Sequence, residues 1–156
     1  MFDEATQAFL HSGCALIVGS SSADGQPLAS RGWGIPGLDP DGEEVTVLLD
    51  DEDEQARDNL AVGSRVAVTA TDVQTLRSLQ MKGEVLAVGP ATAADAKVAR
   101  TYCDDFFGDI ESVDVMHRDV LERMVPAGWF RCRIQVEATF DQTPGPSAGA
   151  PIGAAP

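Results

Sequence analysis

The segment from Thr75 to Val85 constrains the fold most, because its side chains alternate in character. As a β-strand, it would place Leu79, Met81 and Val85 on one side and Ser78, Gln80, Lys82 and Glu84 on the other. The apolar side can pack into a core, and the polar side offers hydroxyl, amide and ammonium groups to a flat, heteroatom-rich ligand. The alternation alone favours a simpler interpretation, in which the polar side meets only solvent.

Short apolar segments separated by tight turns predict most of the remaining structure. The predicted strands are residues 14–19, 28–35, 45–49, 65–69, 75–88 and 129–140, with turns at 20–26 and 37–42. The predicted helices are residues 2–11, a short helix ending near Gly63, one with the stripe Ala94, Val98, Tyr102 and Phe106, and one with the stripe Val113, Met116, Val120 and Met124. This order predicts a mainly β (α+β) fold, an antiparallel barrel with flanking helices. The glycine fingerprint and βαβ alternation of a dinucleotide-binding fold are missing from the sequence.

Composition limits the classes of partner. The chain has 156 residues, enough for one domain with a core, and a net charge of −14. That charge repels nucleic-acid phosphates and anionic lipid, so we expect neither as a partner. No apolar run approaches the ~20 residues of a membrane span, and the start of the sequence lacks the basic residues of a signal peptide. Three widely spaced cysteines fit reduced thiols in the cytoplasm.

Several reactive-looking residue types have structural interpretations. The acidic run Asp50 to Glu54 precedes a helix, where carboxylates cap the positive end of the helix dipole. The cysteines are expected to be small core residues, and no spacing predicts a metal site. His11 and His117 are expected at helix surfaces or ends, although haem ligation by a histidine is conceivable.

Four ordered pieces resemble one known family. They are Ser30-Arg31, residues 45–60 as strand, turn and helix, residues 77–83, and residues 129–142. The chain is similar over roughly residues 5–142 to the pyridoxamine 5′-phosphate oxidase-like family of FMN-binding split barrels, and its ending at 141–146 looks like one branch of uncharacterised members. The resemblance implies a split barrel and a homodimer with two FMN molecules at the subunit interface. Residues 1–142 would then form a single FMN-binding domain, followed by a Pro/Gly-rich arm or tail at 143–156, extended or disordered.

The resemblance also implies which residues contact the cofactor. They are Ser30, Arg31, Arg77, Ser78, Gln80 and Lys82. Arg31 is the first candidate, since a guanidinium can bind phosphate through two hydrogen bonds; without the family, pairing with a carboxylate would be its expected role. Arg77 has the opposite parity from Ser78, so it either bends toward a phosphate or reaches water.

Two departures from the family pattern bear on function. Where the oxidase has a Ser-Arg-Lys phosphate grip, this chain has Asp53-Glu54-Gln55-Ala56, whose carboxylates would repel a phosphate. The oxidase pattern at the C-terminus includes a tryptophan and later arginines, whereas residues 143–156 carry no charge. We therefore expect no pyridoxamine 5′-phosphate oxidase activity.

Two functional hypotheses follow, together with a variant of the first. The first is a cytoplasmic, homodimeric flavoprotein that acts on an unidentified small molecule, in which the flavin transfers the electrons and no side chain need act as acid or base. The second is a degenerate, non-enzymatic split barrel that has lost FMN, motivated by the acidic turn. The variant binds haem or a deazaflavin instead, as other branches of the superfamily do.

Overall fold

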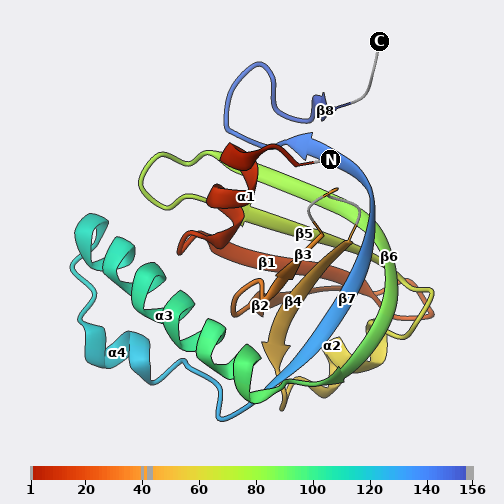
Figure 1. Cartoon of the computed structure of the whole chain (residues 1–156), viewed down its shortest axis with the longest axis horizontal. Helices are drawn as coiled ribbons and strands as arrows, with labels where there is room; N and C mark the ends of the chain where they lie inside the picture. The colour runs from red at the N-terminus through yellow and green to blue at the C-terminus, as the bar shows by residue number, and fades with distance from the viewer. Residues whose placement is uncertain (1, 40, 42–43, 154–156) are drawn as a thin grey trace.

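Six antiparallel strands close into a barrel in the computed structural model, which describes residues 2–39, 41 and 44–153 (Figure 1). The barrel strands are β1 (Ala15–Ser21), β2 (Pro27–Gly32), β4 (Glu44–Asp50), β5 (Arg65–Thr71), β6 (Ser78–Pro90) and β7 (Trp129–Asp141). Their order is β4-β2-β1-β5-β6-β7, and β7 pairs with β4 to complete the circle. The β2–β4 seam is split, with the single register pair Gly32–Leu49. The predicted mainly β barrel with flanking helices is confirmed.

Alternation along the strands builds the barrel interior. Leu79, Met81 and Val85 of β6 are buried, as their period of two predicts. They face apolar side chains from the other strands, including Leu16, Val47 and Ile134. The opposite side of β6 is therefore the outer face of the barrel.

Four helices accompany the barrel in the part of the chain that the structure describes. They are α1 (Glu4–His11), α2 (Glu54–Asn59), α3 (Ala93–Val113) and α4 (Arg118–Glu122). Asp53 caps α2, accepting a hydrogen bond from the Ala56 amide at 2.9 Å, and Thr92 with Asp95 forms a capping box at the start of α3. The expectation that the acidic run caps the helix after it is confirmed.

The largest differences from the predicted strand ends lie at the end of β2 and at the start of β6. The strand predicted over 28–35 ends at Gly32, and Gly34 adopts a φ of +121° where an added Cβ would lie 3.3 Å from Tyr102 Cβ. The segment at 75–77 belongs to a turn, and Leu76 has a φ of +62°, so β6 begins only at Ser78. Gly37–Leu38 forms β3, which extends the sheet beside β4, whereas Pro40 and Gly42 of the predicted turn lie outside the described residues.

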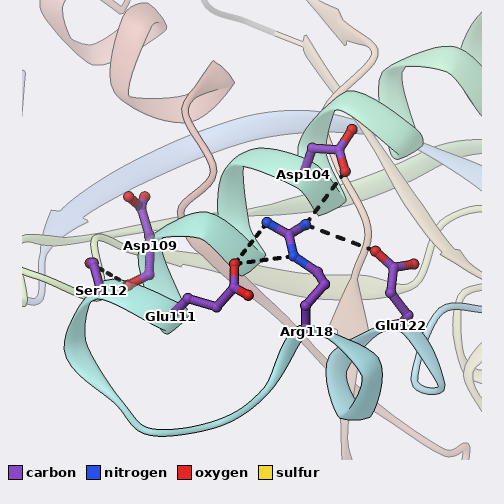
Figure 2. Close-up of polar contacts among 6 residues, drawn as sticks. All are labelled: Asp104, Asp109, Glu111, Ser112, Arg118 and Glu122. Carbon is purple, nitrogen blue, oxygen red and sulfur yellow. Dashed lines mark hydrogen bonds and ion pairs between the residues drawn. The ribbon is translucent and has the colours of Figure 1, made fainter.

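The predicted apolar stripe of the last helix is wrong. Val113 ends α3, α4 is only five residues long, and the side chains of Val113, Met116, Val120 and Met124 are all at least 40% exposed. The inward position is taken by Leu121 and by Arg118, whose guanidinium bonds Glu111 at 2.9 Å and also approaches Asp104 and Glu122 (Figure 2). An ion-pair network between α3 and α4 therefore replaces the expected apolar seam.

The chain folds back after β7. Its C-terminal segment, residues 142–153, ends in β8 (Pro151–Ile152), which pairs with Thr139 and Phe140 of β7. Figure 1 shows β8 at the upper end of the barrel, close to the start of β6.

Candidate functional site

Cross-strand register aligns five side chains on the outer face of the barrel. Arg31 is opposite Ile17, Ile17 is opposite Thr69, Thr69 is opposite Gln80, and Gln80 is opposite Phe140. Directly opposed residues share a face, so these five form a continuous line across β2, β1, β5, β6 and β7, here named the outer-face row. Strands lie about 4.8 Å apart, which separates the Cα atoms of Arg31 and Gln80 by roughly 14 Å.

Polar groups of β6 on this face already have partners in the sheet. Gln80 Nε2 donates to Thr69 Oγ1 at 3.0 Å, and Ser78 Oγ lies 2.9 Å from Thr71 Oγ1. Lys82 is exposed, and its Nζ lies 4.9 Å from the centre of the Phe140 ring. The β6 face is therefore an ordered polar strip beside an aromatic ring.

Arg31 has an unusual environment for an arginine on a sheet surface. It is half-buried, with its guanidinium 5.0 Å from the Phe106 ring of α3 and 5.6 Å from the Trp33 ring. Its Nη1 atom is buried and has no hydrogen-bond partner among the described residues, which also provide no carboxylate within ion-pair distance. A buried cationic donor without a partner is costly, and an anionic ligand would satisfy it.

The structure separates the other two predicted cofactor residues from this face. Ser30 is opposite Val18 of the barrel interior, and its hydroxyl donates to Asp53 at 2.8 Å. Arg77 precedes β6, and its guanidinium lies 4.6 Å from the Phe9 ring of α1. Of the six residues, Arg31, Ser78, Gln80 and Lys82 belong to the outer face, although Arg31 lies three strands from the other three and Ser78 is buried. Their contact with a cofactor stays a prediction.

The acidic turn is occupied by structural interactions. Asp53 accepts from both Ala56 and Ser30, and Asp51 pairs with Arg57. Arg57 also lies 4.7 Å from the Phe130 ring. Asp51 compensates the charge of Arg57, so no described residue of the turn offers an unpaired cation to a phosphate.

A groove of about 420 Å³ lies between α1, the segment after β2, and α3. Its lining comprises His11, Ile35, Pro36, Lys97, Val98, Thr101 and Tyr102. Lys97 forms no ion pair with any described residue, so two basic side chains border an apolar floor. Sequence reasoning missed Lys97 and Thr101, because only the packing of α3 brings them to the end of β2.

The cysteines, Tyr102 and the possible metal ligands of the described residues form no reactive arrangement. Burial raises the pKa of Cys14 and Cys132 to about 12 and that of Cys103 to about 11. Burial also raises the pKa of Tyr102, although the nearby Arg31 acts in the opposite direction. No three potential metal ligands cluster among the residues described, and no helix there is long and apolar enough to cross a membrane.

Comparisons with known proteins agree with this architecture. The family model described as "Pyridoxamine 5'-phosphate oxidase" matches residues 2–132. HupZ from Group A Streptococcus is similar in structure, with 17% identity, a TM-score of 0.58, and coverage of 96% of this chain and 100% of that one. No curated protein sequence matches the chain.

Two further solved structures share the fold. One is described as an F420 reductase, with 16% identity, a TM-score of 0.55, and coverage of 88% of this chain and 98% of that chain. The other is HutZ, described as a heme storage protein from Vibrio cholerae, with 13% identity, a TM-score of 0.52, and coverage of 89% and 93%. At such identities these likenesses extend to the fold alone.

Proposed function

Because the chain belongs to the pyridoxamine 5′-phosphate oxidase family, we propose that it is a flavoprotein that binds FMN along the outer-face row, between the subunits of a homodimer. The observation that supports this most is the buried, unpartnered Nη1 of Arg31 at one end of the row. An anionic group there would satisfy the guanidinium, and the remaining row offers side chains to a planar body.

The fit of FMN to these residues differs from the oxidase pattern. Arg31 would hold the phosphate, since the turn at residues 50–54 is taken up by helix capping and by the Asp51–Arg57 pair. Gln80 and Lys82 would orient the polar edge of the ring, and Ile17, which is 42% exposed, would cover part of its face and exclude water. When bound, the flavin supplies the electron transfer, so the protein acts through position and electrostatics.

The groove at Lys97 is the proposed place for the substrate. Tyr102 borders it and stacks on the Phe106 ring, which the Arg31 guanidinium also contacts, so the groove adjoins the end of the row. The groove combines basic side chains with an apolar floor, an arrangement suited to a small organic anion. The uncharged ending at 143–153 provides no arginine of the oxidase type, so pyridoxamine 5′-phosphate is not the proposed substrate.

Absorption of the purified protein tests the proposal directly. We expect flavin bands in the visible region, release of FMN on denaturation, and a dissociation constant in the micromolar range or below after reconstitution. A colourless protein that gains no colour with FMN, riboflavin or a deazaflavin would support the degenerate, non-enzymatic split barrel instead.

A haem-binding function is the second candidate, because His11 borders an apolar groove. A structurally similar protein is described as a heme storage protein, which makes the comparison worth testing here. Haem titration of the wild type and of the His11→Ala variant decides the point. A Soret shift lost in His11→Ala, but kept in His117→Ala, would establish ligation in the groove. Absence of a Soret shift in the wild type would eliminate this candidate.

A further inference from the structure

Two carboxamides meet where the C-terminal segment crosses the outer face. Gln142 Nε2 donates to Gln80 Oε1 at 3.4 Å, and Gln80 Nε2 donates to Thr69 Oγ1 at 3.0 Å. These three side chains form a chain of hydrogen bonds in which each amide donates to the next residue, from Gln142 to Gln80 and from Gln80 to Thr69. All three are half-buried, so the chain is partly shielded from water.

Backbone hydrogen bonds hold Gln142 in this place. Its N–H donates to the Ser78 carbonyl at 2.9 Å, and the Ser78 N–H donates to Thr143 Oγ1 at 3.0 Å. The preceding Asp141 accepts from the Thr143 N–H at 2.8 Å and from Ser147 Oγ at 3.2 Å. The start of the C-terminal segment is therefore fixed to the first residue of β6.

An amide and a hydroxyl can each donate and accept a hydrogen bond. The Thr69 hydroxyl can therefore bond either Nε2 or Oε1 of Gln80 and does not by itself fix the orientation of that amide. If the Gln80 amide turned over, the Thr69 hydroxyl could donate to Oε1 and Nε2 could donate to Gln142 Oε1. The orientation of the Gln80 amide is therefore tied to the direction of its hydrogen bond with Gln142, whose backbone is fixed to β6 and whose Nε2 is the donor in the structure.

We infer that Gln142 is a positioning residue that sets which hydrogen-bonding groups of Gln80 are offered to the ligand on the outer-face row. This inference rests on the proposed function for its ligand, but not for the side-chain arrangement itself. A flavin ring gains N–H donors when it is reduced, so the orientation that Gln142 holds would suit one redox state better than the other. Gln142 would then influence both the affinity for FMN and its reduction potential.

The test compares Gln142→Met, Gln80→Met and the double variant, with Gln26→Met as a control in the exposed β1–β2 turn. Methionine keeps the side-chain length and removes the amide. We expect Gln142→Met to weaken FMN binding roughly two- to tenfold, the size of one neutral hydrogen bond. The double variant should bind no more weakly than Gln80→Met alone, because Gln142 acts through Gln80. Additive losses, or losses equal to those of the control, would overturn the inference.

A readout without ligand separates this inference from the proposed function. The side-chain amide signals of Gln80 in the NMR spectrum of the free protein should shift in Gln142→Met and remain in place in Gln26→Met. Unchanged Gln80 signals in Gln142→Met would refute the positioning role. If the wild type binds no flavin while these signals do shift, the proposed function fails and the positioning of Gln80 stands.

Discussion

Arg31 combines features that rarely occur together on one residue. Its strand position places it on the outer face, yet α3 covers its guanidinium with the Phe106 ring. Packing against aromatic rings compensates part of the desolvation but provides no acceptor for Nη1. We therefore expect Arg31 to contribute more to the free energy of ligand binding than to the free energy of unfolding.

The variant Arg31→Met tests this at the level of one residue. We expect FMN affinity to fall tenfold to hundredfold, since a hydrogen bond to a charged group contributes about 1.5–3 kcal/mol. Affinity for riboflavin, which lacks the phosphate, should change little, and the free energy of unfolding should stay constant or rise because a buried unsatisfied donor is removed. Fluorescence titrations with both ligands and urea denaturation measure these effects.

The matched control for that experiment is Arg57→Met. Arg57 pairs with exposed Asp51 and also packs on a ring, but it lies in α2, just after the acidic turn. Equal losses of FMN affinity in both variants would show that the phosphate binds the turn after all.

At the scale of elements, the pairing of β6 with β7 contains a bulge that the sequence pattern does not mark. The register shifts between Lys82 and Gly83, so Glu137 has no opposing residue in this part of the ladder. An added Cβ at Gly83 would lie 1.8 Å from the Gln135 carbonyl oxygen. The close approach of the two backbones therefore requires glycine at position 83.

The pair Gly83→Ala and Gly89→Ala tests this requirement. Gly83→Ala should cost about 2 kcal/mol or more of unfolding free energy, because backbone must move to relieve the clash. Gly89→Ala should change stability by no more than about 0.5 kcal/mol, since an added Cβ there meets no atom within 4 Å. Chemical denaturation of both variants provides the comparison, and similar stabilities would contradict the bulge.

The attachment of the C-terminal segment should depend on pH through Asp141. Hydrogen bonds from Thr143 hold the pKa of this carboxyl below its ordinary value of 3.8. A lowered folded-state pKa means that the interaction is fully present above 3.8 and is lost as the pH falls through the folded-state value. NMR signals of residues near Ile152 should therefore report detachment only below pH 4.

Asp141→Asn should loosen the same segment at neutral pH, because its amide nitrogen can no longer accept a hydrogen bond. Asp24→Asn is the control, since Asp24 also has a lowered pKa but lies in the β1–β2 turn. Detachment of residues near Ile152 in the control would argue against a local role of Asp141.

At the scale of the whole molecule, a large negative charge coexists with exposed apolar side chains. The net charge is −14, while Ile17 on the outer face and Val120 on α4 are 42% and 48% exposed. Single exposed apolar side chains are ordinary on a protein surface, but Ile17 lies in the outer-face row, where the proposed interface would bury it, and the acidic remainder favours solubility.

The proposed homodimer leads to a prediction about mass. Light scattering should give twice the 16.4 kDa of one chain, and added salt should strengthen association by screening the like charges of the two copies. Ile17→Glu should produce a monomer that also loses FMN, because it places a charge in the outer-face row. Val62→Glu, at a position that is 71% exposed in a loop, should remain dimeric. A monomeric wild type would refute the interface.

Features that depend on neighbouring residues were predictable from the sequence. Period-two alternation placed Leu79, Met81 and Val85 inside the barrel, and the acidic run Asp50 to Glu54 predicted a capped helix start. Both patterns arise from interactions within a few residues, which composition and spacing record directly.

Features that depend on distant contacts were decided only by the tertiary structure. Strand pairing across β2, β1, β5 and β6 brought Arg31 into line with Gln80, α3 covered the Arg31 guanidinium, and the return of the chain placed Gln142 beside Gln80. The stripe at Val113 to Met124 shows the reverse case, because a helical spacing indicates a shared face but not whether that face is covered. Local geometry thus determined the elements and the alternation of their side chains, whereas packing between elements decided which of those side chains form a candidate site.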